Sequence, residues 1–268
     1  MQTTSIKNQA DKSYVAEQYA DTKRLAARIR LYDDFRDPRD PSLTSWVFAG
    51  LGLQPGMRVL EVGAGTGLLW AENRAQIPDG LALTISDNSP AMLEAAKARL
   101  GDAFEYRLMA VESLSAPDAV YDVVIANHML YHVAHRAEAL SEIRRVLRPG
   151  GRLYATTNGW THIIELRTVI ERFHPEAHVV PARHTLGVFD VEQGADELRA
   201  VFDQLKVLNY RSRLEVTDAD ALVNYVQTIL PNGPSARCEP LRNYVQQIIN
   251  EQGHFHIGTW VGLFVATK

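Results

Sequence analysis

The sequence has 268 residues, and its 46% of hydrophobic residues can bury a core of ordinary size in one large domain or two small ones. A formal net charge of −4 gives no overall basic field, so we expect neither a nucleic-acid partner nor a membrane partner. No apolar run approaches the roughly 18 residues of a membrane span, the start lacks a signal-like apolar region, and the single cysteine fits a reducing compartment, so we expect a cytoplasmic protein.

Two helices are predicted at the start of the chain. Residues 11–35 carry apolar side chains at helical spacing among charged ones, which is typical of an amphipathic helix. Asp40 and Pro41 are expected to be the N-cap and first residue of a second helix. We assign residues 1–52 to an N-terminal helical cap and residues 53–268 to the main domain.

The stretch MRVLEVGAGTGLLW, residues 57–70, predicts a strand, a glycine turn and a helix. Residues 58–62 have the apolar, β-branched character of a buried strand. Gly63, Gly65 and Gly67 follow, and glycine permits positive φ angles and close approach of a ligand to the backbone. A dinucleotide fingerprint would place its third glycine at the position of Leu68, so the spacing does not fit that fingerprint.

A second strand is predicted over residues 81–85, and Asp87 follows it. Ser89 and Pro90 are expected to be the N-cap and first residue of the next helix. Asp87 lies 87 − 67 = 20 residues after Gly67, the separation at which an acid accepts hydrogen bonds from the ribose of a nucleoside held on the turn. Together the glycine turn and Asp87 predict a nucleoside site.

The third and fourth strands are predicted over residues 104–108 and 121–126, and polar residues follow the fourth. His128, Tyr131 and His132 form the densest group of proton acceptors in the sequence. Histidine titrates near neutral pH and could deprotonate a hydroxyl or ammonium nucleophile, so we take these three residues as catalytic candidates. A helix over residues 137–147, a turn at Gly150 and Gly151, and a fifth strand over residues 152–156 are predicted next.

From Met57 to Thr157 the segments resemble, in order, four motifs of the class I S-adenosylmethionine-dependent methyltransferases of small-molecule type. The glycine turn has the form E-x-G-x-G-x-G beginning at Glu61, and the string EIRRVLRPGGRLY after the fourth strand resembles the corresponding family segment. The resemblance implies an α/β, Rossmann-like, doubly wound and mostly parallel sheet of seven strands, with an N-terminal helical cap and a lid insertion after strand 5 at about residues 158–190. It also implies S-adenosyl-L-methionine as the cofactor.

The family pattern often has an acid after the third strand, where this sequence has Ala110, so adenine recognition is left to the Val111 backbone or to Glu112. The cofactor-binding residues that the motifs predict are Glu61, Gly63, Ala64, Gly65, Gly67, Asp87, Asn88, Met92, Val111, Glu112 and Asn127.

Beyond residue 158 the sequence follows no family motif. The predicted elements are a helix over 160–174, a helix over 190–205, a strand over 207–216, a helix over 218–229, and a closing strand or hairpin over 255–266. The substrate-binding candidates are Tyr14, Tyr19, Trp160, Glu165 and His184. Four histidines occur between residues 162 and 184, but their spacing is not that of a metal site, and we expect no metal.

These observations predict methyl transfer from S-adenosylmethionine to a nitrogen or oxygen atom of a small-molecule acceptor. Two alternatives stay open: an NAD-dependent oxidoreductase, and a non-methylating protein that keeps the fold and binds S-adenosylmethionine. A nucleic-acid methyltransferase is disfavoured because no N/D-P-P-Y/F motif for a flipped base follows the fourth strand. The sequence is compatible with a homo-oligomer and does not identify the acceptor.

Overall fold

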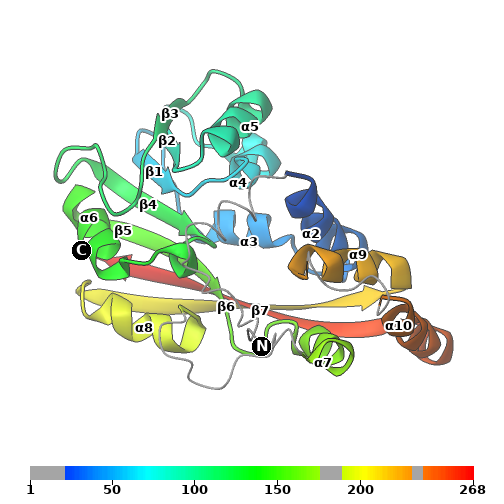
Figure 1. Cartoon of the computed structure of the whole chain (residues 1–268). Coiled ribbons are helices and arrows are strands. Elements are labelled where there is room, and N and C mark those ends of the chain that lie inside the picture. Colours follow the sequence, from blue (N-terminus) through cyan, green and yellow to red (C-terminus); the bar gives the residue numbers. More distant parts are fainter. Residues whose placement is uncertain (1–21, 176–188, 231–237) are drawn as a thin grey trace. The chain divides into compact units, whose positions relative to one another are not determined.

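A seven-stranded sheet confirms the predicted α/β fold class. The computed structural model describes residues 22–175, 189–230 and 238–268, and within them the strand order is β3-β2-β1-β4-β5-β7-β6 (Figure 1). Strands β1 to β5 are parallel to one another, and β7 is antiparallel to β5. The strands are β1 (Arg58–Val62), β2 (Ala82–Asp87), β3 (Glu105–Leu108), β4 (Tyr121–Asn127), β5 (Leu147–Asn158), β6 (Gln204–Val216) and β7 (Phe255–Thr267).

The chain divides into two compact units. One, called the sheet unit, contains residues 41–159, 189–210 and 261–268; the other, called the helical unit, contains the remaining described residues. Strands β6 and β7 each contribute residues to both units. The units do not follow the predicted boundary at residue 52, because the second helix of the chain groups with the sheet unit.

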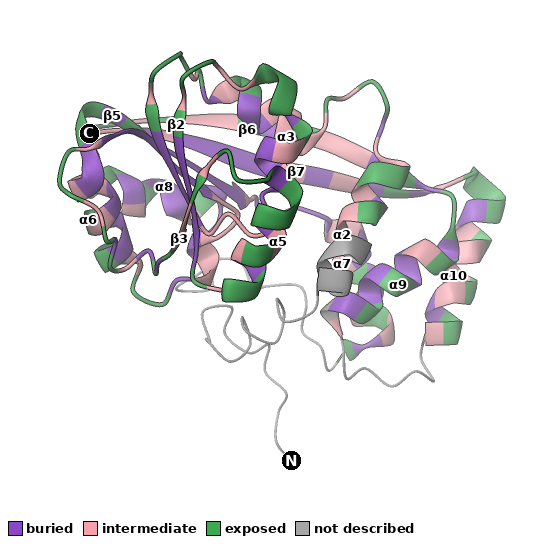
Figure 2. Ribbon diagram, turned by 90° about the horizontal axis from the view of Figure 1, so that it is seen from above, coloured by how far each residue is buried: buried purple, intermediate pink, exposed green. Residues whose placement is uncertain are grey.

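In the sheet unit, helices cover both faces of the sheet. Helices α3 (Leu43–Gly50), α4 (Leu68–Glu72) and α5 (Pro90–Leu100) share one hydrophobic core with side chains from β1, β2 and β4. Helices α6 (Arg136–Val146) and α8 (Val191–Arg199) share the core on the opposite face. Alternate residues of a strand enter the two cores, as Val59 and Leu60 of β1 do. A strand covered on both faces is buried along most of its length, as residues 121–126 of β4 are, and Figure 2 shows the middle of the sheet largely as buried.

The helical unit has a hydrophobic core of its own. It is built from α2 (Thr22–Phe35), α7 (Ile164–Phe173), α9 (Ala219–Ile229) and α10 (Cys238–Gln252), together with residues of β6 and β7. Leu166 of α7, Leu222 of α9 and Val245 of α10 are fully buried in this core. Two short 3-10 turns, η1 (Arg74–Gln76) and η2 (Leu130–His132), complete the described elements. None of the described helices is long and apolar enough to cross a lipid bilayer.

The predicted N-cap at Asp40 and the predicted turn at Gly150 and Gly151 both differ from the structure. Helix α3 is capped by Ser42, whose hydroxyl accepts a hydrogen bond from the Ser45 amide at 3.2 Å, and not by Asp40. The Asp40 carboxylate instead accepts a hydrogen bond from the Ser212 hydroxyl at 2.6 Å. The predicted turn at Gly150 and Gly151 does not end the helix before it, since α6 ends at Val146 and β5 already begins at Leu147.

Several boundaries in the last third of the chain differ from the prediction. The helix expected over 160–174 is α7, which begins at Ile164, and the helix expected over 190–205 is α8, which ends at Arg199. The closing element is one long strand, β7. Helix α10 was not predicted, although Leu241, Val245 and Ile249 recur at a spacing of four residues and are all buried.

Gly262 allows helix α8 to pack closely on β7. A Cβ atom at Gly262 would lie 2.6 Å from Cγ2 of Val191, a side chain with little rotamer freedom. We expect Gly262→Ala to lower the free energy of unfolding by about 1–3 kcal/mol, because the added methyl group overpacks this contact. Urea unfolding measures the change. The double variant Val191→Ala/Gly262→Ala should recover part of the loss, and strictly additive effects of the two substitutions would contradict this account of the contact.

Candidate functional site

The predicted nucleoside-binding residues lie at the carboxyl ends of β1, β2 and β4. The strand order places β1 between β2 and β4 (Figure 1). From β1 the chain adds β2 and β3 towards one edge of the sheet, and from β4 it adds strands towards the other edge. In open parallel sheets such a reversal of strand order leaves a crevice at the carboxyl ends of the strands, where ligands bind. The glycine turn follows β1, Asp87 ends β2, and Asn127 ends β4.

The glycine turn adopts a conformation that favours glycine. The φ angles of Gly63 and Gly65 are +63° and +56°, in the left-handed region. A Cβ atom at Gly63 would lie 2.9 Å from the Met129 side chain, whereas a Cβ atom at Gly65 would meet no atom within 4 Å. The turn at Gly65 is therefore open on the side where a side chain would project. The helix that follows, α4, has only five residues.

Asp87 connects the glycine turn to the start of α5. Its Oδ2 accepts a hydrogen bond from the Gly65 amide at 2.9 Å, and its Oδ1 accepts one from the Ser89 amide at 2.9 Å. The residue is 7% exposed. Burial raises the pKa of the Asp87 carboxyl, and the bonds from the Ser89 and Gly65 amides oppose that rise. Each carboxylate oxygen keeps further acceptor capacity, as a ribose with two hydroxyl groups requires.

Glu61 is held against Trp70 beneath the turn. Its Oε2 accepts a hydrogen bond from Nε1 of Trp70 at 2.5 Å, and its carbonyl accepts one from the Ser86 hydroxyl at 2.8 Å. Burial raises the pKa of Glu61 to about 8, the Trp70 bond opposes the rise, and the negative charge of Asp87 adds to it. The carboxyl that was predicted to bind the cofactor is thus bonded to an indole, a partner that the sequence pattern did not reveal.

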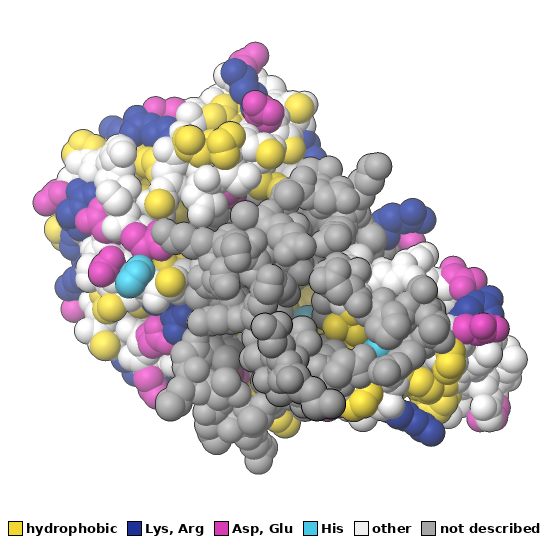
Figure 3. Space-filling model, viewed as in Figure 1, with side chains coloured by type: hydrophobic (Ala, Val, Ile, Leu, Met, Phe, Trp, Pro, Cys, Tyr) yellow, Lys and Arg dark blue, Asp and Glu magenta, His cyan; other side chains and the backbone are white. Residues whose placement is uncertain are grey.

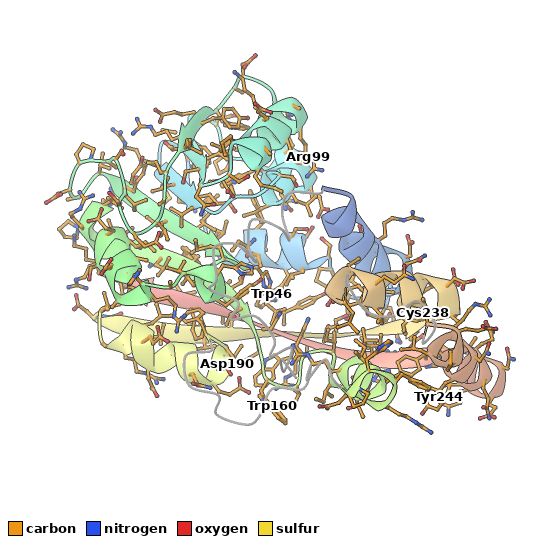
Figure 4. All side chains as sticks on the ribbon, viewed as in Figure 1. Trp46, Arg99, Trp160, Asp190, Cys238 and Tyr244 are labelled. Carbon is orange, nitrogen blue, oxygen red and sulfur yellow. The ribbon has the colours of Figure 1, made fainter. Side chains whose placement is uncertain are left out.

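Arg99 of α5 holds the turn from the outside. One guanidinium nitrogen, Nη1, donates to the Thr66 carbonyl at 3.1 Å and to the Thr66 hydroxyl at 2.7 Å. Figure 4 shows Arg99 beside α4 and α5. Together with the bond between Gly65 and Asp87, these contacts fix the turn at two successive residues. Sequence reasoning missed Arg99, because only the folded α5 brings it to Thr66.

At the end of β4, Thr156 organises the polar residues. Its hydroxyl donates a hydrogen bond to Oδ1 of Asn127 and accepts one from the His128 amide at 3.0 Å. His128 has a φ angle of +50°, a region that residues other than glycine rarely adopt. Thr156 was not predicted as a site residue, because its role depends on the pairing of β4 with β5.

The three catalytic candidates lie together after β4. The ring of His128 is 6.3 Å from that of Tyr131, and the rings of Tyr131 and His132 are 4.4 Å apart, measured between centroids. Nε2 of His128 is buried and has no hydrogen-bond partner among the described residues. Burial lowers the pKa of His128 to about 4, and His132 contributes to the decrease. The imidazole of His128 is therefore neutral at neutral pH.

The remaining cofactor candidates lie near the same strands but differ in exposure. Asn88 is exposed. Met92 is only 2% exposed, so protein atoms already cover its side chain. Val111 is buried, and Glu112 lines an open depression with Glu138 and Glu142 of α6.

Two substrate-binding candidates belong to the helical unit. Glu165 accepts a hydrogen bond from the Gly258 amide at 3.0 Å, and the Trp160 carbonyl accepts a hydrogen bond from Nη1 of Arg167 at 3.4 Å. Tyr14, Tyr19 and His184 lie outside the described residues. Over the part of the chain that the structure describes, no group of three or more His, Cys, Asp or Glu side chains is arranged to hold a metal ion.

Charged side chains are mixed on the visible surface. On the face drawn in Figure 3, Lys and Arg side chains are interspersed with Asp and Glu side chains around the edge. The arginines near the end of α6 also have acidic partners: Arg144 pairs with Asp203 at 3.2 Å and Arg145 with Glu142 at 2.7 Å.

Comparison with known proteins identifies the central part of the chain. Residues 60–155 match the family model described as a methyltransferase domain. A malonyl-[acyl-carrier protein] O-methyltransferase of Paenibacillus sp. (strain JDR-2) is 26% identical over 147 residues, which cover 53% of this chain and 53% of that protein. A ubiquinone/menaquinone biosynthesis C-methyltransferase of Vibrio campbellii is 28% identical over 169 residues, which cover 61% of this chain and 63% of that protein.

A solved structure shows the same fold over most of the chain. Phosphoethanolamine N-methyltransferase 2 of Haemonchus contortus, in complex with phosphomonomethylethanolamine and S-adenosylhomocysteine, has a TM-score of 0.58 at 19% identity. The likeness covers 94% of this chain and 59% of that one. The chain spans about half to two thirds of the length of the two curated relatives.

The burial of Glu61 predicts a pH-dependent stability. The pKa of this carboxyl is about 8 in the folded protein and near its ordinary value of 4.5 in the unfolded chain. Between these two pKa values the folded state binds more protons than the unfolded chain does. The protonated Glu61 therefore makes its whole contribution to the free energy of unfolding below pH 4.5, and that contribution is lost as the pH rises towards 8. Glu61→Gln keeps an oxygen that accepts from Trp70 but removes the titration.

We therefore expect the free energy of unfolding of Glu61→Gln, measured relative to that of the wild type, to rise when the pH is raised from 5 to 8. The rise should exceed about 1.4 kcal/mol, the energy that corresponds to one pKa unit. Urea unfolding of both proteins at the two pH values measures the difference. Parallel pH dependences for the two proteins would contradict the burial of a protonated Glu61.

Proposed function

We propose that the chain, whose residues 60–155 match a methyltransferase domain, is a class I S-adenosylmethionine-dependent methyltransferase that transfers the methyl group of S-adenosylmethionine to a nitrogen or oxygen atom of a small molecule. The observation that carries the proposal is the hydrogen bond from the Gly65 amide to the Asp87 carboxylate. It joins the open glycine turn to a buried acid at the end of the neighbouring strand, which is the arrangement that a nucleoside requires.

We assign the cofactor to the crevice at the carboxyl ends of β1, β2 and β4. In this assignment the backbone from Gly63 to Gly67 faces the amino-acid part of the cofactor, and the Asp87 carboxylate accepts the two ribose hydroxyl groups. The open side of Gly65 supports close approach of the ligand to the main chain. Asn127, held by Thr156, borders the crevice at β4.

The chemistry requires mainly alignment. The cofactor supplies a methyl group that its sulfonium already activates, so the protein has to hold the acceptor atom in line with the breaking bond and exclude water. Positioning of this kind contributes roughly 7–11 kcal/mol to lowering a reaction barrier. Asp87 and the turn would fix the cofactor, and the residues after β4 would contact the acceptor.

The side chain of His128 is better suited to forming a hydrogen bond with the acceptor than to removing a proton from it. A general base is most effective when its pKa lies near the working pH, and the pKa of His128 is lowered to about 4. A neutral imidazole with a buried, unpartnered Nε2 can instead orient a hydroxyl or amine group through a hydrogen bond. A carbon acceptor would need a stronger base, so this site favours a nitrogen or oxygen acceptor.

The two rival hypotheses make different predictions about ligands and products. An NAD-dependent oxidoreductase would need a glycine where Leu68 begins α4. A non-methylating protein would bind S-adenosylmethionine without producing S-adenosylhomocysteine. Mass spectrometry of small molecules incubated with the protein and S-adenosylmethionine tests the proposed transfer: a product heavier by one methylene group supports it, and cofactor binding without any methylated product across broad acceptor panels supports the non-methylating alternative.

Removing the Asp87 carboxylate should weaken cofactor binding. We expect Asp87→Ala to reduce the affinity for S-adenosylhomocysteine by about 1–3 kcal/mol, because two charge-assisted hydrogen bonds to the ribose are lost. Isothermal titration calorimetry measures the change. Asp102→Ala is the matched control, since this exposed acid pairs with Lys97 at 3.0 Å away from the glycine turn's hydrogen bonds, and the affinity of this variant for S-adenosylhomocysteine should equal that of the wild type. Equal affinities for all three proteins would refute the ribose assignment.

A side chain at Gly65 should block the turn. We expect Gly65→Val to abolish S-adenosylhomocysteine binding, because the added atoms would occupy the open space that we assign to the ligand. The φ angle of +56° also strains any residue other than glycine, so circular dichroism must first establish that the variant is folded. A folded Gly65→Val protein that binds with wild-type affinity would place the cofactor elsewhere.

A further inference from the structure

Arg167 lies on the side of α7 that faces the core of the helical unit. Ile163, Ile170 and His174 share this side at helical spacing, and all three are buried. Positions on such a face usually hold apolar side chains. Arg167 itself is half-buried, so its guanidinium is only partly hydrated and a partner is needed to compensate its charge.

No acidic side chain compensates Arg167 within the described ranges. Its Nη1 donates to the Trp160 carbonyl at 3.4 Å, near the limit for a hydrogen bond. The titratable groups that act on the guanidinium are the phenols of Tyr225 and Tyr32, with no carboxylate among them, and burial lowers the pKa of Arg167. Arg167 is half-buried, and guanidinium groups held largely out of water are normally paired with an acid, so this one has the character of an anion site that a ligand can reach.

The polar neighbours of Arg167 are committed to other partners. Glu165, two residues earlier, accepts from the Gly258 amide of β7 at 3.0 Å. Nδ1 of His162 accepts from the Trp260 amide at 3.1 Å, and its Nε2 lies 3.0 Å from the Tyr32 hydroxyl. A ring nitrogen that accepts an amide proton carries none itself, so His162 adds no positive charge in this arrangement.

The backbone at the start of α7 is strained. Ile163 has a φ angle of +52°, which is unfavourable for a β-branched residue, and its amide donates to the Gly258 carbonyl at 2.9 Å. Such strain persists only where the surrounding structure enforces it, and it is concentrated at ligand sites. Here it sets the direction in which α7 begins, and hence the place of Arg167 one turn later.

We propose that Arg167, with Tyr32 and Tyr225 beside it, is a binding site for a carboxylate group. The planar guanidinium matches a carboxylate in shape and can donate two parallel hydrogen bonds to it. One positive charge neutralises one carboxylate, whereas a phosphate dianion would leave a negative charge uncompensated among phenols. The inference rests on the proposed function in one respect only, which is that the carboxylate belongs to the methyl acceptor.

Thermal unfolding of the full chain with benzoate, at constant ionic strength and without cofactor, tests the site. Benzoate should raise the unfolding temperature of the wild type saturably. Arg167→Met should abolish that response and should unfold at or above the wild-type temperature without ligand, because an uncompensated charge has been replaced by an apolar side chain. Arg172→Met is the matched control: Arg172 lies on the same helix over the Tyr244 ring, 4.6 Å from its centroid, and this variant should keep the full benzoate response.

A second measurement does not depend on the folding of Arg167→Met. In nuclear magnetic resonance spectra of the wild type labelled with nitrogen-15 at arginine, the Nε–H signal of Arg167 should shift and saturate with benzoate. Arg167→Lys, which identifies that signal by its absence, should bind benzoate about ten-fold more weakly because it lacks the planar fork.

Three results would overturn the proposal: no saturable benzoate response in the wild type, an equal response in Arg167→Met, or tighter binding of inorganic phosphate than of benzoate. Titration with S-adenosylhomocysteine separates this inference from the proposed function. Retained cofactor binding together with a failed benzoate test rejects the carboxylate site alone, whereas a wild type that binds no cofactor rejects the methyltransferase proposal.

Discussion

The hydrogen bond from the Gly65 amide to the Asp87 carboxylate joins two loops that the sequence separates by more than twenty residues. It can form only because β1 and β2 are parallel neighbours in register, so that both end at the same edge of the sheet. The helices on the two faces bury these strands and keep that edge in place. The open turn at Gly65, the brace from Arg99 and the acceptor oxygens of Asp87 all depend on this one connection.

Glu61 and Asp87 are both buried near the glycine turn, and they differ in their hydrogen-bond partners. Glu61 is bonded to an indole and its pKa is raised to about 8, partly by the charge of Asp87. Asp87 accepts two backbone amides, which favour its ionised form against the effect of burial. Glu61, with a pKa of about 8, is therefore largely protonated at neutral pH, and Asp87, which keeps two backbone amides as partners, is the residue that we assign to the ribose. The helical unit presents the opposite situation, because the Arg167 guanidinium has no acidic partner among the described residues.

Sequence patterns predict the features that depend on neighbouring residues. The apolar runs, the glycine turn, Asp87 and the Ser89 cap of α5 were all expected and are present, and the family comparison confirms the fold class. Features that depend on distant contacts were missed. The Glu61–Trp70 bond, the role of Thr156 and the brace from Arg99 exist only after the sheet and its helices assemble. The expected cap at Asp40 was wrong because Ser212, far along the chain, takes its carboxylate as a partner. Helix α10 was missed although its apolar spacing was readable, so that omission was not a limit of the sequence.

A crystal structure of the protein grown with S-adenosylhomocysteine is the most direct test of the central claim. The account predicts both ribose hydroxyl groups within hydrogen-bonding distance of the Asp87 carboxylate and the ligand running along the backbone from Gly63 to Gly67. The Gly65 to Asp87 bond should persist in the complex. A ligand bound away from the carboxyl ends of β1 and β2, or a ribose that makes no contact with Asp87, would contradict the account.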